Sequence, residues 1–176
     1  MSGRDEGNTV VELELVGVRV ELPANQPIVL LKERDGSRYL PIWIGAPEAT
    51  AIAFALQGVE TPRPMTHDLF VATLDALGTT LTAVHVTRLS EGTFYAELHL
   101  EQDGETTVVS ARPSDAIAIA SRMDDIPILG AEEVLEEAGL EIDDDEDETE
   151  SGDPDEEVRR FREFLDNVAP EDFQQG

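Results

Sequence analysis

The chain lacks several residues and segments that would mark a specialised class of protein. Its 176 residues include no cysteine and one tryptophan, and aromatic residues make up 5% of the total. The absence of cysteine excludes disulfides and thiolate zinc sites. No apolar run approaches the roughly 20 residues needed to span a bilayer, and residues 1–8 contain no apolar core of a secretion signal. We therefore expect a cytoplasmic protein that makes no use of a membrane.

Positive charge is also scarce. The chain has 12 Lys/Arg against 39 Asp/Glu, a formal net charge of −27. Residues 1–140 hold 9 Lys/Arg and 23 Asp/Glu, a net charge of −14, whereas residues 141–176 hold 3 and 16, a net charge of −13. Such a field repels polyanions at long range and counts against a high-affinity nucleic-acid binder. It still allows an enzyme with a small local cationic site or a bound metal.

The charge distribution also predicts where the folded domain ends. Residues 1–8 are polar and predicted to be disordered, and residues 9–140 show the apolar patterning of one domain. Residues 141–154 predict an acidic disordered linker, because a dense block of like charges repels itself. Residues 155–176 predict a short amphipathic helix and tail. The apolar side of this helix, within residues 155–168, could dock on the domain or on a protein partner.

One order of elements occurs twice between residues 9 and 140. Strand, strand, Asp-Gly turn, strand and helix follow one another in residues 9–57 and again in residues 80–123. The phrases Glu48–Ala53 and Asp115–Ala120 share the pattern [Asp/Glu]-Ala-x-Ala-Ile-Ala. This repetition favours a duplication over two α/β units that look alike by chance. The predicted fold class is α+β, with duplicated β-β-β-α units in a mixed or antiparallel sheet covered by helices, and a disordered acidic C-terminal tail.

Three local signals refine this prediction. Gly17 interrupts the alternation of residues 9–22 and indicates a bulge in the first strand. Residues 48–56 and 114–123 predict buried helices, whose alanines allow close approach to a sheet. Residues 68–77 predict a connecting helix between the two units, with Thr66 as its N-cap.

The triplet Thr66-His67-Asp68 is the first candidate for chemistry. Histidine is the best general base near neutral pH, and aspartate is a hard oxygen ligand for Mg²⁺ or Mn²⁺. Phosphodiester hydrolysis needs such groups, together with a cation that stabilises developing charge. The competing interpretation is structural: Thr66 and Asp68 cap a helix, and His67 is an exposed residue of its first turn.

The second candidate is the junction Arg112-Pro113-Ser114-Asp115, with Glu48 at the matching place of the first unit. Arg112 could hold a phosphate through two parallel hydrogen bonds, and Asp115 could ligate a metal ion. In the structural interpretation, Ser114 or Asp115 caps the helix, Arg112 is its surface ion pair, and Glu48 compensates the helix dipole.

These candidates give a predicted site. The catalytic residues would be His67, Asp68, Arg112 and Asp115. The metal ligands would be Asp68, Asp115 and Glu48, holding Mg²⁺ or Mn²⁺. Two further residues would bind substrate: Arg63, in a loop stiffened by two prolines, as a phosphate contact, and Tyr95 as a stacking surface for a base.

Four phrases together resemble the bifunctional nuclease domain family, in its actinobacterial form. They are Arg38–Gly45, Pro62–Leu69, Gly92–Ala96 and Ala111–Ala118, and they follow the family's order over about residues 10–140. Actinobacterial members also end in an acidic linker and a short Phe-rich tail. The resemblance implies an α+β domain and nuclease activity on DNA and RNA. Six residues match its phrases and suit phosphoryl chemistry: Glu48, Arg63, His67, Asp68, Arg112 and Asp115.

Two functions follow as hypotheses. The first is a metal-assisted nuclease, a phosphodiester hydrolase that binds nucleic acid as a transient substrate. The second is a non-catalytic regulatory or protein-interaction module that uses the same fold and the acidic tail; the excess of negative charge favours it. Under either hypothesis we expect a homo-oligomer, because a domain of this class has exposed sheet edges.

Overall fold

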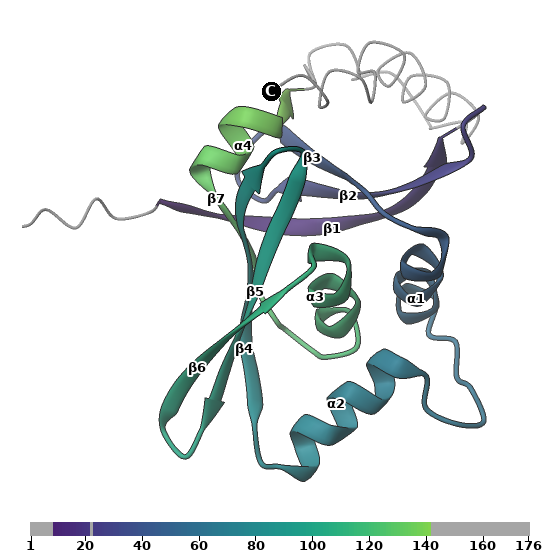
Figure 1. The fold of residues 1–176 in the computed structure, drawn as a ribbon, viewed down its shortest axis with the longest axis vertical. Helices are drawn as coiled ribbons and strands as arrows, with labels where there is room; N and C mark the ends of the chain where they lie inside the picture. Colours follow the sequence, from purple (N-terminus) through teal and green to yellow (C-terminus); the bar gives the residue numbers. More distant parts are fainter. Residues whose placement is uncertain (1–8, 22, 142–176) are drawn as a thin grey trace, which may run out of the picture.

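One bent sheet forms the framework of the protein. The structure is a computed structural model, and it describes residues 9–21 and 23–141. Eight strands follow the order β6-β5-β4-β7-β1-β2-β3-β8. Their bounds are Val10–Glu21 (β1), Gln26–Glu33 (β2), Arg38–Trp43 (β3), Thr80–Ser90 (β4), Thr93–Gln102 (β5), Glu105–Ala111 (β6), Ile128–Ala131 (β7) and Leu140–Glu141 (β8). Figure 1 shows strands β1 to β3 crossing strands β4 to β6 at a wide angle.

Helices fill the angle of this sheet. Four are described: α1 (Ala46–Leu56), α2 (Thr66–Ala76), α3 (Pro113–Ala120) and α4 (Glu132–Ala138). Helix α3 lies inside the angle, with α1 and α2 beyond it, and α3 contacts both of them (Figure 1). Helix α4 contacts β3, β4 and β7. These observations confirm the α+β class and the mixed sheet, because β7 pairs antiparallel to β1 and parallel to β4.

The predicted duplication is visible in the topology. Strands β1, β2 and β3 pair antiparallel and lead into α1, and strands β4, β5 and β6 do the same and lead into α3. The first strand of each unit borders the same short strand, β7, so the two units extend outward from it in opposite directions. The two strand-to-helix junctions therefore lie on the same side of the sheet, inside its angle.

The core confirms the close packing predicted for an alanine-rich helix. In α3, the three alanines at 116, 118 and 120 are at most 5% exposed, and Ile117 is fully buried. They pack between sheet residues such as Val84 and Leu98, which are also buried. The predicted bulge is present as well, since the register between β1 and β2 shifts between Leu15 and Gly17. Gly17 has a φ of +151°, a conformation that favours glycine.

Helix α1 departs from the prediction. Although it carries the same sequence phrase as α3, only Ala49 and Ile52 are buried in it. The difference arises because α3 lies inside the angle of the sheet, where it meets β4, β5, α1 and α2, whereas α1 lies farther out and contacts β1, β2 and α3.

The predicted helix caps are also wrong in detail. Met65, not Thr66, is the N-cap of α2, and Thr66 is its first helical residue. Arg112, rather than Ser114 or Asp115, is the N-cap of α3, and Ser114 is buried. In both helices the acidic residue stands in the third position, where a carboxylate interacts with the helix dipole and with free N–H groups.

Three sequence predictions lie outside the described residues: the frayed residues 1–8, nearly all of the acidic linker 141–154, and the amphipathic segment 155–168. Within the described residues, no helix is both long and apolar enough to cross a membrane.

Candidate functional site

Four of the predicted residues meet where α1, α2 and α3 come together. We call Glu48, His67, Arg112 and Asp115 the junction cluster. His67 Nε2 lies 3.0 Å from Asp115 Oδ1. Arg112 donates to both oxygens of Asp115, from Nε at 2.8 Å and from Nη2 at 3.1 Å. Its Nη1 donates to Glu48 Oε1 at 2.9 Å. Residues up to 67 positions apart in the sequence thus form one hydrogen-bonded group.

The duplication explains why the cluster forms. Glu48 and Asp115 are each the third residue of a helix that follows a strand, and each helix has a proline in its first turn. Proline suits that turn because its missing N–H would be unpaired there anyway. At Gly45, a Cβ would meet the carboxylate of Glu48, so glycine leaves room for this side chain to fold back over the start of its own helix. Arg112 then bridges the two junctions.

The pair of His67 and Asp115 has the geometry of an oriented base. Burial raises the pKa of the Asp115 carboxyl, but hydrogen bonds from Arg112 and His67 lower it by more, so the pKa lies below its ordinary value. Asp115 is therefore ionised at neutral pH and can only accept hydrogen bonds. Nε2 of His67 must carry the proton in this contact, which leaves Nδ1 of the neutral ring free to take one.

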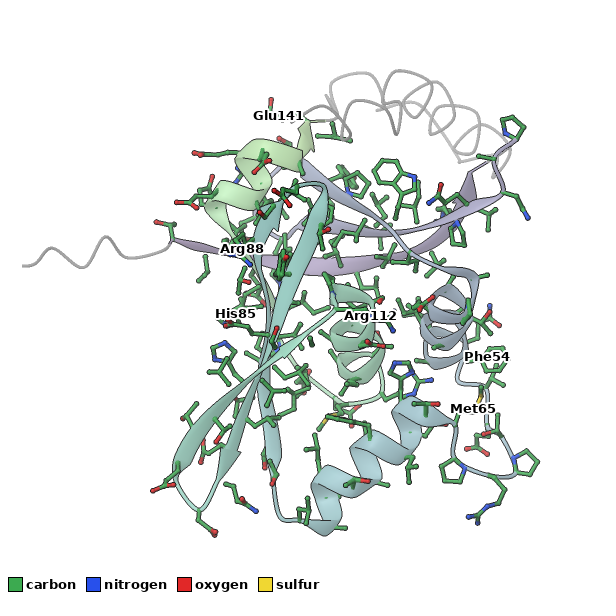
Figure 2. All side chains as sticks on the ribbon, in the orientation of Figure 1. Phe54, Met65, His85, Arg88, Arg112 and Glu141 are labelled. Carbon is green, nitrogen blue, oxygen red and sulfur yellow. The ribbon has the colours of Figure 1, made fainter. Side chains whose placement is uncertain are left out.

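Arg112 is the exposed member of the cluster. Its side chain is 64% exposed, compared with 20% for Glu48, 16% for His67 and 32% for Asp115. Hydrogen bonds to Asp115 and then to Glu48 raise the pKa of the guanidinium above its ordinary value. A permanent cation is thus held beside the histidine, with much of its donor surface open to solvent. Figure 2 shows Arg112 between α3 and α1.

Asp68 is next to His67 in sequence but has other partners. Its Oδ1 accepts from Arg122 Nε at 2.5 Å, and its Oδ2 accepts from the N–H of Met65 at 2.9 Å. The hydrogen bond from Arg122, supported by that from Met65, lowers the pKa of Asp68. Asp68 therefore caps α2 and ties it to the end of α3. This is the structural role that the sequence left open as an alternative.

Sequence reasoning missed Arg122, which is only 10% exposed and also donates to the carbonyl of Ala118 at 2.7 Å. A signal was available. Arg122 follows Asp115 by seven residues, and in the helix predicted over residues 114–123 two helical turns bring such residues to the same face. In the structure α3 ends at Ala120, and Arg122 lies in the turn that follows. Both face α2, where the neighbouring residues His67 and Asp68 meet them.

The two predicted substrate contacts lie apart from these ion pairs. Arg63 is exposed in the loop before α2, where its carbonyl accepts from the hydroxyl of Thr61 at 2.6 Å. Tyr95 is on β5, with the guanidinium of Arg88 over its ring at 4.1 Å. The next residue, Ala96, is fully buried on the side of α3, so Tyr95 faces the opposite side of the sheet. The structure therefore brings four of the seven predicted residues together.

A cavity adjoins the site. It has a volume of about 480 Å³ and lies between the end of α1, helix α2 and residues 121–124. Its lining combines Asp68 and Arg122 with apolar side chains that include Phe54. A second cavity of about 430 Å³, on β1 and the end of α3, includes none of the predicted site residues in its lining.

The carboxylates do not form a complete set of metal ligands. No group of three His, Cys, Asp or Glu side chains in residues 9–21 and 23–141 is arranged to hold an ion. Glu48 and Asp115 do converge, because both contact the guanidinium of Arg112. Mg²⁺ binds through one or two carboxylates when waters and substrate phosphates complete its shell. In this arrangement, however, Arg112 occupies Glu48 and Asp115 as Arg122 occupies Asp68, so an ion at this pair would have to displace the guanidinium.

Comparisons with known proteins show the family of this chain. Residues 29–143 match the family model described as the bifunctional nuclease domain. A Mycobacterium tuberculosis protein, named as uncharacterized in two strains, is 52% identical over 163 residues, or 92% of this chain and 97% of that protein. The Arabidopsis thaliana protein Bifunctional nuclease 1 is 32% identical over 103 residues, or 56% of this chain and 32% of that protein. The chain therefore belongs to the bifunctional nuclease domain family.

Proposed function

We propose that this protein is a nuclease that hydrolyses phosphodiester bonds of DNA or RNA at the junction cluster. The observation that carries the proposal is the contact between His67 and Asp115 beside the exposed cation of Arg112. A histidine whose second nitrogen is held by a carboxylate is a typical general base. The family supports the same reaction, since one relative is named as a bifunctional nuclease.

In the proposed reaction, His67 accepts a proton at Nδ1 from a water molecule whose oxygen attacks phosphorus. The bond from phosphorus to one ester oxygen breaks, and that oxygen takes up a proton, which the imidazolium can return. Arg112 neutralises the charge that develops on the phosphoryl oxygens. Asp115 keeps the imidazole oriented and stabilises its charged form, as the acidic member of a catalytic triad does.

A divalent ion, Mg²⁺ or Mn²⁺, is part of this proposal. Glu48 and Asp115 are the side chains that would hold it, with the guanidinium of Arg112 turned from them toward the substrate phosphate. Bound there, it would supply Lewis-acid stabilisation of the phosphate. Asp68 remains a predicted ligand, although its contacts with Arg122 and Met65 favour a positioning role for it. The apolar part of the neighbouring cavity would exclude water from one side of the substrate.

The test is cleavage of end-labelled single-stranded DNA and RNA by the full-length protein, with Mg²⁺, Mn²⁺ or a chelator. Loss of a general base costs about 10²–10⁴-fold in rate, so we expect this loss for His67→Gln. His85→Gln is the matched control, because His85 stacks on His99 in the sheet and is no part of the cluster. Cleavage that persists undiminished in both His67→Gln and Asp115→Asn would indicate a contaminant and refute the proposal.

One observation favours the alternative, a non-catalytic regulatory or interaction module. Within the junction cluster, Arg112 forms ion pairs with both Glu48 and Asp115 and so links α1 to α3. Such a network can serve stability alone. Under this alternative the wild-type protein would cleave neither substrate with any metal, and Arg112→Ala would lower the melting temperature without any other consequence.

A further inference from the structure

Strand β6 forms an open edge of the sheet. It pairs with β5 in an unbroken register from Glu105, opposite Gln102, to Ala111, opposite Ala96. Among the described residues no strand pairs with its other side, since β6 ends the strand order. Alternate N–H and C=O groups of such a strand point outward without a partner, which makes it a template for another strand.

The side chains of β6 are equally open. Each residue from Glu105 to Ser110 is exposed, so neither face of this strand is covered. Val108 and Val109, which point to opposite faces, are 49% and 40% exposed. The central residues of the strand, Thr106 to Val109, are four β-branched residues, a class that is enriched in strands. The sequence of β6 therefore favours strand pairing, although its outer side has no partner strand among the described residues.

The usual protection of an edge is missing here. Natural edges carry Pro, Lys, a bulge or a very short strand, whereas β6 has seven residues, no basic residue, no proline and no register shift. The opposite end of the sheet shows the contrast. There β8 is two residues long and ends in the charged Glu141. Among the residues that the structure describes, β6 is therefore the long edge without these protective features.

Charge and symmetry both favour a second copy of this chain as the partner of the β6 edge. In a chain of net charge −27, residues 106–110 carry none, so two acidic copies meet the least repulsion there. Two identical strands related by a two-fold axis perpendicular to the sheet must run antiparallel. Centred on Val108, this pairing places Glu105 opposite Ala111 of the second copy, so that like charges do not face each other across the contact.

We propose that β6 pairs with β6 of a second copy, forming a homodimer in which the two sheets become continuous. This surface does not depend on nuclease activity. Strand β6 ends one residue before Arg112, so pairing would also steady the segment that carries the guanidinium of the junction cluster.

The first test is the mass of the full-length protein by sedimentation over a range of concentration and salt. We expect a dimer that tightens as salt screens the net charge. The double variant Val108→Lys/Val109→Lys should be monomeric and still folded, because both side chains are exposed, and its melting temperature should fall only by the stabilisation that dimerisation gives the wild type. Val59→Lys, at an exposed valine of a loop, is the matched control and should remain dimeric. A wild-type monomer under all conditions, or a dimer in the double variant, would overturn the proposal.

The absence of cysteine allows a direct second test. Directly opposed residues of antiparallel strands have Cα atoms about 4.5–5.5 Å apart, within the range that a disulfide spans. A single Val108→Cys substitution should therefore form an intermolecular disulfide rapidly on mild oxidation, at least ten times faster than Val59→Cys. Equal rates for the two variants would mean that they cross-link by random collision and that β6 does not self-pair.

Discussion

His67 acquires its proposed role from contacts that join separate parts of the chain. Its partner Asp115 lies 48 residues away, and the guanidinium that holds Asp115 also holds Glu48 from the other unit. The sequence identified each of these residues as suited to phosphoryl chemistry. It could not show that they meet, because that depends on how α1 and α2 pack against α3.

Asp68 gives a prediction about pH. Its hydrogen bonds with Arg122 and Met65 hold its pKa below the ordinary value, so it stabilises the fold fully above about pH 4, the pKa of an unfolded aspartate. This stabilisation is lost as pH falls below that point and Asp68 takes up a proton. We expect Asp68→Asn to cost about 1 kcal/mol at pH 7, because solvent screens a pair that is partly exposed.

The measurement is the melting temperature of the wild-type protein and Asp68→Asn from pH 7 to pH 2.5. The difference should be constant down to about pH 4 and then shrink, since the wild-type carboxyl becomes neutral as well. Asp75→Asn is the matched control, at an exposed position on the same helix. A difference that stays the same below pH 3 would show that the ionised carboxylate is not the stabilising group.

At the scale of elements, helix α2 shows how far an apolar pattern predicts burial. Leu69 and Leu74 in this helix and its C-cap Leu77 are expected at helical spacing, yet only Leu74 is buried, and Leu69 is 57% exposed. The reason is that α2 packs on one side only, against α3 and the start of β4. Spacing predicted the helix correctly but could not show which of its apolar residues reach the core.

Leu74 and Leu69 therefore make a matched pair on one helix. Leu74→Ala should lower the free energy of unfolding by about 2–4 kcal/mol, because it leaves a cavity under α2. Leu69→Ala should change it by less than about 1 kcal/mol, since a residue that is mostly exposed loses little buried area. Urea unfolding of both variants measures the difference. Equal losses would mean that Leu69 is covered in solution, by a partner or by another part of the chain.

The whole molecule combines a continuous core with an unusually uneven charge. The described residues form one sheet and one hydrophobic cluster that includes residues of both duplicated units, such as Leu31 and Leu98. The segment that follows adds mainly charge. Net charge of this size affects solubility and association more than it affects the fold.

We therefore expect the protein to fold without residues 142–176. A segment that carries so much charge buries little apolar surface, and its removal also lowers the self-repulsion of the chain. The melting temperature of residues 1–141 should lie within a few degrees of the full-length value, and calorimetry on both proteins measures it. A large drop would show that residues 142–176 contribute to the core.

The sequence by itself determined the class of fold, the duplication, the bulge at Gly17 and the family. Each of these follows from local sequence signals: the alternation of apolar and polar residues, the turn residues, and a phrase repeated in the same order. Only the tertiary structure decided that Glu48 and Asp115 both accept hydrogen bonds from Arg112 and that Asp68 accepts one from Arg122. It also decided that α3 is largely buried whereas most of α1 is not. The physical reason is common to all three. Helical spacing places a residue on a face of its own helix, but the bend of the sheet decides what that face meets.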